Sequence, residues 1–519
     1  MYINFYGAVR EVTGSMHLIG SGQTRILLDC GMFQGHRKEA AEKNRVMPID
    51  PGGIANVVLS HAHIDHSGRL PLFCAKGTFT GQIMCTGATR DVCEYLLLDA
   101  AHIQESDAEY LNYKAVRNVL SQMKDDKTYG GDIKAFLKKN RYELDVAHIN
   151  EIGRKLKLDM VEPLYTAADA ENAVSLLHGY PYGTEVRVGP NMTAVQYNAG
   201  HILGSAVTFI KVEEDNRTKV IAFSGDLGRF DKPIIKDPQV NFPEELKNVD
   251  LMLMESTYGN REHAPTEDIK PKLQRIINET IEGGGTLLIP AFAFGRAQEL
   301  IYYIHELYDE KAVPNVPVYV DSPLANNITK VFGEHPELYD ADTHATFLEK
   351  GKNPFDFKNI HFVQSAEESM KLTMDNSPHI VLASSGMMEA GRILHHLRYK
   401  IHNHRTTILI SGYMAVNTLG RRIADLSAEY VANNRKGPAP TVKILGKEYT
   451  LNARVETLDG LSAHADKNEI KHWLKASGLN VKRIALVHGE EDQMTAFADD
   501  LRASGYEVEI PFQGQTLLV

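Results

Sequence analysis

In the first 90 residues, short apolar runs alternate with Gly-rich segments. They predict strands separated by Gly-rich turns, at 2–6, 16–19, 25–28, 56–59 and 82–85. Because this spacing leaves little room for helices between the strands, we expect a largely antiparallel sheet. From residue 91 to about 177 the apolar positions recur with a helical period. Within it, the charged, Lys-rich stretch 114–160, broken by two glycines at 130–131, predicts an added helical excursion on the surface.

Strands return after this stretch, and then the pattern changes again. Apolar runs predict strands at 185–188, 193–197, 206–212, 219–223 and 249–254. From residue 285 strands and helices alternate five times, with the strands at 286–290, 316–320, 360–363, 379–383 and 406–410. Such alternation is typical of a doubly wound parallel α/β domain. Later strands at 441–445, 450–458 and 483–487 predict a return of the chain, so we expect 1–257 and 431–519 to flank an inserted domain at 258–430.

The composition is that of a soluble globular protein with more than one core. The chain has 519 residues, of which 43% are hydrophobic and 24% charged, and this length favours two domains. The net charge of −11 argues against a broad basic surface for nucleic acid. It does not exclude a local one, because bound dications draw phosphate to a site.

Cysteine use and the N-terminal sequence favour a cytoplasmic location. The four cysteines, Cys30, Cys74, Cys85 and Cys93, have no paired C-x-x-C spacing, which indicates neither a disulfide framework nor a thiolate zinc site. The first residues lack a basic segment followed by an apolar run, and no stretch reaches the roughly 20 apolar residues of a membrane helix. We therefore expect neither secretion nor membrane insertion.

The strongest chemical signal is the sequence SHAHIDHSG at 60–68, directly after a predicted strand. Three imidazoles and a carboxylate within six residues need partners, because unpaired buried polar groups cost free energy. His61 and His63 point to one side of an extended segment, while Asp65 and His66 begin the next turn. One loop can therefore serve two adjacent cations. These ligands suit Zn²⁺ best, with Mn²⁺ or Fe²⁺ as alternatives, and a loop held by hydrogen bonds alone is the plain alternative.

Three further polar residues follow strand ends. His201 and Asp226 each lie beside glycine at the exit of a strand, in NAGHILGS and SGDLG. Glycine lets the backbone bend a side chain toward a shared site, so we interpret both as further metal ligands. Asp29, at the tip of strand 25–28, either caps a turn or orients an imidazole, and the neighbouring histidine cluster favours the second role.

The order of these residues resembles a known superfamily. Asp29, the H-x-H-x-D-H loop, His201 and Asp226, all on strand ends, are similar to the four-motif signature of the metallo-β-lactamase superfamily. The resemblance implies an αββα sandwich with a dinuclear zinc site, two Zn²⁺ per chain. It implies one metal held by His61, His63 and His201, a second held by Asp65 and His66, and a bridge between them formed by Asp226.

Three later segments narrow the resemblance. Glu255 ends a predicted strand, His464 lies in SAHAD and His488 lies in VHGE; these positions resemble motifs A, B and C of the β-CASP nucleases. The resemblance covers nearly the whole chain apart from 114–160 and is closest to the RNA-cleaving branch. In the DNA-processing branch motif C is typically apolar, whereas His488 supplies a ligand for the second metal. RNA in single-stranded form is therefore the expected partner.

The resemblance also implies a mechanism. Two metal ions about 3.5–4 Å apart activate a water and clamp a phosphodiester, and the resulting hydroxide attacks phosphorus in line. His464, oriented by Glu255, is the expected proton donor to the leaving group, and a purely structural bridge between the two is the alternative. Asp29 and Asp65 are counted with this catalytic group. The expected products carry 5′-phosphate and 3′-hydroxyl ends.

The inserted domain is expected to close over the metals and hold the RNA strand. The sequence SSG at 384–386 lies between a strand and a helix predicted at 391–399, where backbone amides can meet a phosphate. Ordinary turn chemistry explains these three residues equally well. Contacts to phosphate carry no base identity, so no sequence preference follows. The residues expected to contact RNA are Arg296, Ser384, Ser385, Gly386, Arg392 and His395.

Three rival functions stand beside this hypothesis. A small-molecule hydrolase, such as a thioesterase or lactonase, uses the same metals but needs no domain to hold phosphate. A DNA-processing enzyme shares the whole platform. An inactive RNA-binding subunit is expected to lack ligands, and here every ligand position is filled. We expect endonucleolytic RNA processing, and a homodimer is left open.

Overall fold

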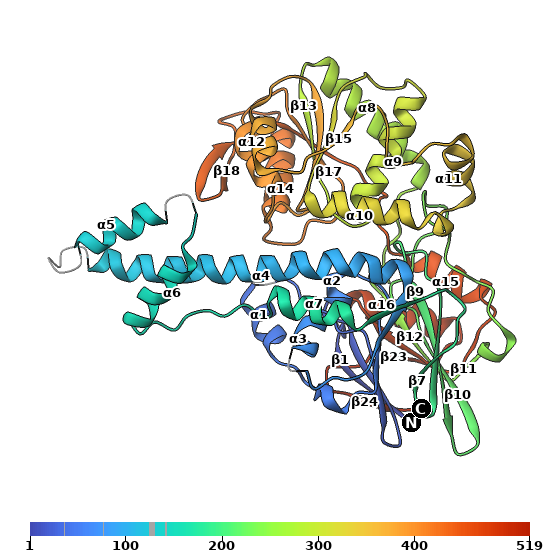
Figure 1. Cartoon of the computed structure of the whole chain (residues 1–519). Coiled ribbons are helices and arrows are strands. Elements are labelled where there is room, and N and C mark those ends of the chain that lie inside the picture. Colours follow the sequence, from blue (N-terminus) through green and yellow to red (C-terminus); the bar gives the residue numbers. More distant parts are fainter. Residues whose placement is uncertain (36, 76, 124–129, 141–142) are drawn as a thin grey trace.

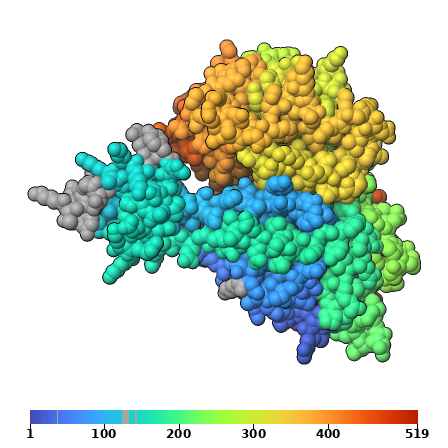
Figure 2. Space-filling view, viewed as in Figure 1, coloured from blue at the N-terminus to red at the C-terminus, as the bar shows by residue number. Residues whose placement is uncertain are grey.

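Two domains are stacked on one another, and a helical arm projects from the side of their junction (Figure 1). The computed structural model describes residues 1–35, 37–75, 77–123, 130–140 and 143–519. The space-filling view in Figure 2 shows the inserted domain resting on the long helix of the first domain. The two chain ends lie close together, since the Val519 N–H donates to the Met1 carbonyl at 3.2 Å.

The first sheet of the first domain is mixed. In pairing order its strands are β24 (Thr516–Leu518), β1 (Tyr2–Gly7), β2 (Met16–Ser21), β3 (Thr24–Leu28), β4 (Asn56–Val58), β5 (Ile83–Thr86) and β6 (Leu177–Tyr180). Pairs from β24 to β3 are antiparallel and pairs from β3 to β6 are parallel. The expected antiparallel sheet is therefore wrong for the second half, because helical crossovers link those strands. The crossovers contain α1 (Arg37–Arg45), α2 (Ile64–Ser67), α3 (Leu70–Cys74) and α4 (Gly87–Gln122).

A second sheet packs face to face on the first. In pairing order it contains β23 (Val508–Glu509), β22 (Ile484–Val487), β12 (Leu251–Glu255), β10 (Arg217–Phe223), β9 (Ala206–Glu214), β8 (Met192–Asn198) and β7 (Val186–Gly189). Phe5 and Leu28 of the first sheet share one buried core with Ile210 and Phe223 of the second. Burial of each such side chain contributes roughly 1.5–3 kcal/mol.

Helices cover the outer faces of both sheets. On the first sheet lie α4 and α7 (Ala167–Ser175), whose buried residues share a core with Leu18 and Val57. On the second lie α15 (Lys467–Ala476) and α16 (Glu491–Ala503), through Trp473 and Phe497. The predicted αββα sandwich is confirmed. Two short strands, β11 (Asn248–Val249) and β21 (Asn480–Val481), pair beside it.

The inserted domain is built on a six-stranded parallel sheet. Its strands, in spatial order, are β15 (Ile360–Phe362), β14 (Val318–Asp321), β16 (His379–Ala383), β13 (Thr286–Pro290), β17 (Thr407–Ile410) and β20 (Arg454–Thr457). Leu287 and Ile289 of β13 face one core, and Leu288 between them faces another. The first core holds residues of α8 (Ile269–Glu282), α9 (Arg296–Asp309) and α10 (Pro323–Glu334), and the second holds residues of α12 (Ala366–Met374), α13 (Ile393–Lys400) and α14 (Leu419–Ala432). Helices on both faces confirm the doubly wound arrangement, and α11 (Ala341–Thr346) completes the helices of this domain.

The inserted sheet continues beyond residue 430, where we expected the domain to end. β20 pairs in parallel with β17. The hairpin of β18 (Thr441–Ile444) and β19 (Lys447–Thr450) places Val442 and Ile444 in the core of the inserted domain. The sequence predicted these strands but not the sheet that they join. We therefore propose that the chain returns to the first domain after Thr457.

The predicted helical excursion is an arm. Its α4 begins at Gly87, four residues before the expected start, because the Thr86 hydroxyl accepts the Thr89 N–H at 3.2 Å. The tip is formed by α5 (Gly130–Lys139) and α6 (Val146–Lys155), which pack on the end of α4 around Phe136 (Figure 1). Residues 124–129 and 141–142 of the excursion lie outside the described part. No helix in that part is long and apolar enough to cross a membrane, and all four cysteines are buried free thiols.

Candidate active site

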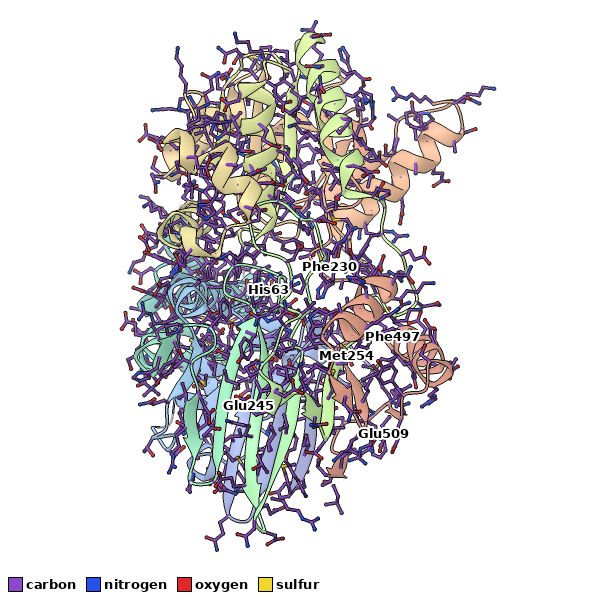
Figure 3. All side chains as sticks on the ribbon, turned by 90° about the vertical axis from the view of Figure 1, so that its right-hand side faces the viewer. His63, Phe230, Glu245, Met254, Phe497 and Glu509 are labelled. Carbon is purple, nitrogen blue, oxygen red and sulfur yellow. The ribbon has the colours of Figure 1, made fainter. Side chains whose placement is uncertain are left out.

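The predicted metal ligands meet at one end of the sandwich, where strands of both sheets finish. His61 and His63 follow β4 of the first sheet, while His201 follows β8, Asp226 follows β10 and His488 follows β22 of the second. In Figure 3, His63 lies at the junction with the inserted domain. Residues from positions as distant as 61 and 488 therefore share one end of the sandwich, at the junction with the inserted domain.

One group of ligand atoms consists of three imidazoles and a carboxylate. The His63 Nδ1 lies 3.1 Å from the His61 Nε2 and 3.3 Å from the His201 Nε2. The Asp226 Oδ2 lies 3.4 Å from the His61 Nε2 and 3.5 Å from the His201 Nε2. Ligands about 2.0–2.1 Å from a tetrahedral Zn²⁺ lie roughly 3.3–3.4 Å from each other. The spacing of these four atoms therefore fits a zinc ion.

A second group adjoins the first. The His66 Nε2 lies 3.0 Å from the His488 Nε2, which in turn lies 3.3 Å from the Asp65 Oδ2. The Asp226 Oδ1 lies 3.2 Å from the His66 Nε2. Asp226 thus directs one oxygen to each group, and both groups hold their ligand atoms within 4.8 Å of one another.

The Asp226 carboxylate provides the test of metal fit. It is buried, and neither of its oxygens has a hydrogen-bond partner among the described residues. Imidazole nitrogens of His61, His66 and His201 lie within 3.5 Å of it, yet none makes a hydrogen bond to it. A buried carboxylate in this state is costly unless a cation pairs with it. The donor set therefore fits bound metal beside Asp226.

Burial keeps His61 and His63 in the neutral form that binds metal. It lowers the pKa of His61 to about 3 and that of His63 to about 4. Burial also opposes ionisation of Asp226, but the neighbouring imidazoles of His488 and His66 outweigh it and hold the pKa of Asp226 well below its usual range. Neutral imidazole and ionised carboxylate are the states that coordinate a cation.

Asp29 supports the cluster from behind. Its Oδ2 lies 2.7 Å from the His66 Nδ1 and accepts the hydroxyls of Ser15 and Ser60, each at 3.0 Å. Its Oδ1 accepts the Ser60 N–H at 2.8 Å. These bonds fix the Nδ1–H tautomer of His66 and turn its Nε2 toward the cluster. The preferred interpretation, a carboxylate that orients an imidazole, agrees with this geometry.

Thr257 orients His488, and sequence analysis missed this residue. Its hydroxyl lies 3.0 Å from the His488 Nδ1 and leaves the Nε2 of that ring for the cluster. Thr257 lies two residues after Glu255, in the loop that follows β12. Because its partner is 231 positions away, no local pattern could have indicated the contact.

Glu255 and His464 form the expected pair. The His464 Nδ1 lies 3.2 Å from each carboxylate oxygen of Glu255, which is fully buried. Glu255 is itself held by the N–H groups of Leu227 at 2.6 Å and Thr257 at 3.3 Å. Burial alone would lower the pKa of His464, but the carboxylates of Glu255 and Asp226 raise it to about 9. The His464 side chain is 19% exposed, so its Nε2 edge can meet a substrate beside the cluster.

The residues expected to hold phosphate are largely engaged in structure. The Ser385 hydroxyl accepts the N–H groups of Glu389 at 3.1 Å and Ala390 at 3.2 Å. The Ser384 hydroxyl lies 2.9 Å from that of Ser322. The helix that follows starts at Ile393, two residues later than predicted. These contacts agree with the turn chemistry that we had left as the alternative.

Arg392 and Arg296 differ in how many of their guanidinium donors already have partners. Arg392 donates to the Asp321 Oδ1 at 2.7 Å and to the Gln364 carbonyl at 3.0 Å, so it ties α13 to β14. Arg296 opens α9 and pairs with Glu299 at 2.9 Å, but its Nε has no hydrogen-bond partner among the described residues. The other oxygen of Glu299 pairs with Lys232 at 3.0 Å, a buried cation that sequence analysis did not single out. For His395 the structure shows only a half-buried ring on α13.

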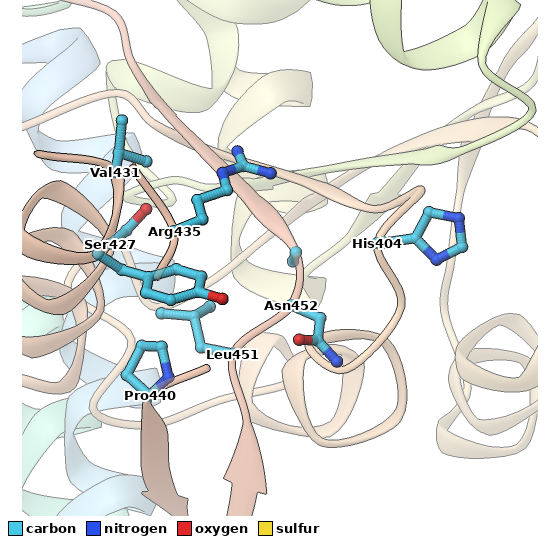
Figure 4. A pocket seen from close by; sticks show the side chains of 9 residues that line it. His404, Ser427, Val431, Arg435, Pro440, Leu451 and Asn452 are labelled. Carbon is cyan, nitrogen blue, oxygen red and sulfur yellow. The ribbon is translucent and has the colours of Figure 1, made fainter. Parts of the chain in front are cut away.

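A separate small pocket lies elsewhere in the inserted domain. It measures about 160 Å³ and lies between α14 and the segment around β18 and β19 (Figure 4). His404, Tyr430 and Arg435 are among its lining residues. None of the predicted site residues lines it.

Comparison with known proteins identifies the family of the chain. The chain matches three family descriptions in order: Metallo-beta-lactamase superfamily over residues 9–82, Beta-Casp domain over 297–423, and Zn-dependent metallo-hydrolase RNA specificity domain over 448–511. It is 34% identical over 510 residues to Ribonuclease TTHA0252 of Thermus thermophilus, with 98% of each chain covered. The chain belongs to the β-CASP family of the metallo-β-lactamase superfamily.

Other relatives extend the β-CASP comparison. Transcription termination factor FttA of Methanosarcina mazei is 28% identical over 505 residues, which cover 96% of this chain and 68% of that protein. A crystal structure of a protein of unknown function from Enterococcus faecalis matches with a TM-score of 0.51 and 12% identity, covering 100% of this chain and 99% of the other. At that identity the second match shows the fold alone.

Proposed function

We propose that this β-CASP protein is a zinc-dependent ribonuclease that hydrolyses phosphodiester bonds in single-stranded RNA. The observation that carries the proposal is Asp226, buried between two groups of ligand atoms with no hydrogen-bond partner among the described residues. The end-to-end similarity to Ribonuclease TTHA0252 and the match to an RNA specificity domain support RNA as the substrate class.

The donor set supports two Zn²⁺ per chain, with Mn²⁺ as the alternative metal. When bound, such a pair of ions activates a water and stabilises the charge of a phosphodiester. His61, His63 and His201 hold one position, Asp65, His66 and His488 hold the other, and Asp226 serves both. His488 completes the second position, and this favours RNA over DNA by the family resemblance.

His464 is the proposed proton donor to the leaving oxygen. Its Nδ1 faces both oxygens of Glu255, so the ring has a fixed orientation and its Nε2 carries the transferable proton. A rigid, correctly placed donor of this kind lowers the barrier to departure of the RNA 3′-oxygen. Arg296, with its unpartnered Nε, is the best supported of the expected phosphate contacts.

Three finer points belong to the same proposal. We propose endonucleolytic action, RNA processing as the role, and the cytoplasm as the compartment, the last supported by four free thiols. A homodimer stays open, and a size measurement in solution decides it.

The test uses metal-loaded protein and three labelled substrates: single-stranded RNA, single-stranded DNA and a generic ester. We expect cleavage of RNA, including a circular RNA that only an endonuclease opens. The Asp226→Ala variant is the matched control, because it removes the shared ligand. Cleavage of the ester without RNA, or of DNA in preference to RNA, contradicts the proposal.

A further inference from the structure

Two exposed aromatic rings lie on neighbouring loops of the inserted domain. Phe292 is 42% exposed and follows β13, and Tyr413 is 53% exposed and follows β17. These two strands pair in parallel, so both loops leave the carboxyl end of the sheet. Ligands of open parallel sheets bind outside that end.

The loop that carries Phe292 reaches the metal ligands. The ring centroid of Phe294 lies 5.5 Å from that of His63. A side chain at Gly295 would begin 3.5 Å from Ile202, the neighbour of His201. Two residues extend a chain by at most about 7 Å, so the backbone of Phe292 lies within that distance of the backbone of Phe294. The exposed ring of Phe292 therefore belongs to a loop that contacts the metal ligands through Phe294.

Packing on one side of this ring and hydrogen bonds of its backbone hold the ring and its loop in place. A Cβ on Gly386 would lie 2.8 to 3.0 Å from three ring carbons of Phe292, so the ring occupies the space of the missing side chain. The Ala291 N–H donates to the Ala383 carbonyl at 3.1 Å, and the Ala297 N–H donates to the Phe292 carbonyl at 3.2 Å. The ring thus has a solid backing and a fixed loop, and binding need not order it.

A second glycine lies near the ring of Phe292, on the next loop. The next loop approaches the ring at Gly412, where a Cβ would lie 4.0 Å from the Phe292 Cε2. Glycine at positions 386 and 412 thus removes two side chains that would otherwise contact the ring, and 42% of Phe292 stays exposed. Exposed aromatic rings beside a polar site are the surfaces on which single-stranded nucleic acids stack their bases.

We propose that Phe292 stacks against a nucleobase of the RNA strand, close to the phosphate that is cleaved. The proposal rests on the ribonuclease function proposed above and adds a residue that contacts a base rather than a phosphate. Stacking tolerates every base, so Phe292 gives affinity and places the strand without selecting its sequence.

The experiment pairs Phe292→Ala with RNA that lacks one base. A short RNA with a defined cleavage site is prepared with an abasic residue at each position around that site. For intact RNA, loss of one stack is expected to raise KM about 5- to 150-fold, with a smaller change in kcat. At one position the abasic residue should raise the KM of the wild-type protein by a similar factor. At that position it should cause no further rise in the KM of Phe292→Ala.

Matched variants separate stacking from packing. Phe292→Leu keeps apolar cover on Gly386 and should behave like Phe292→Ala, whereas Phe292→Tyr should retain the wild-type KM. Phe512→Ala removes a ring that is 58% exposed in the C-terminal part of the chain and should change nothing. Quenching of a 2-aminopurine base at the sensitive position, followed by stopped flow before cleavage, gives a readout of stacking apart from activity.

The outcomes are distinct. Equal losses of Phe292→Ala on intact and abasic RNA at every position overturn the stacking role and leave a structural one. An unchanged KM also overturns it and points to contact with a protein instead. A wild-type chain that cuts no RNA overturns the ribonuclease proposal itself, and this one with it.

Discussion

Two buried carboxylates on opposite sides of the domain junction differ in whether they have hydrogen-bond partners. Asp226, in the metallo-β-lactamase domain, has no hydrogen-bond partner among the described residues although three imidazoles lie within 3.5 Å. Asp321, in the inserted domain, lies 2.7 Å from Arg392 and from His396 and accepts the Ser369 hydroxyl at 2.6 Å. Both are almost fully buried.

The difference separates a ligand site from a structural network. A buried polar group with complete partners stabilises the fold, and an incomplete one marks the place of something that binds. By this criterion the cluster around Asp226 binds metal. The basic residues around Asp321 hold α13 and β14 together, and they are poor candidates for RNA contact.

The largest expected effect comes from Asp226→Ala. Because each metal position loses a ligand, zinc content should fall from about two per chain to one or none, and RNA cleavage should fall to background. Elemental analysis and a cleavage assay measure both, and a chelator should mimic the loss in the wild-type chain. Retention of both ions with full activity would contradict the role of Asp226 as a ligand of both metal positions.

His464→Ala should lower kcat by about 10²- to 10⁴-fold, the range for a lost proton donor, with zinc retained. Replacement of the RNA 3′-oxygen by sulfur should restore much of the rate, because a thiolate leaves without a proton. The Glu255→Gln variant serves as a milder control. Equal losses on oxygen and sulfur substrates would assign His464 a structural role.

Asp29→Asn should cost about 10- to 100-fold in zinc affinity or activity, as for other residues that orient a metal ligand. Asp29 has a φ of 57°, which asparagine tolerates, so the variant removes charge without new backbone strain. Zinc titration against a competing chelator measures the loss. An affinity equal to wild type would show that the serines alone orient His66.

The smallest effect on catalysis is expected from Arg392→Ala. It leaves Asp321 short of one charged donor, so unfolding free energy should fall by about 1–3 kcal/mol, while KM for RNA should stay within about twofold. Denaturant unfolding and steady-state kinetics measure the two quantities. Arg296→Ala is the contrasting variant: it also loses an ion pair, so we expect a similar loss of stability, but with a clear rise in KM. A large increase in KM for Arg392→Ala would instead support contact between Arg392 and RNA.

Local patterns were sufficient for most of the metal site. His61, His63, Asp65 and His66 are close in sequence, and each of the remaining ligands lies within three residues of the end of a buried strand. The first sheet was harder, since strand spacing says nothing of direction, and short helices made half of it parallel. We expected β20 beyond the domain boundary at residue 430, but it pairs with β17 of the inserted sheet, because the sequence of a strand does not identify its neighbour.

By itself the sequence predicted most strands and helices, the residues that meet in the cluster of metal-ligand side chains, and an α/β domain that interrupts a sandwich. Only the tertiary structure decided which polar groups find partners. Arg392 meets Asp321 across 71 positions, Thr257 meets His488 across 231, and the ring of Phe292 fills the space left by Gly386. The physical reason is that hydrogen bonds and close packing depend on distances in space, and a linear pattern records only the residue types that can make them.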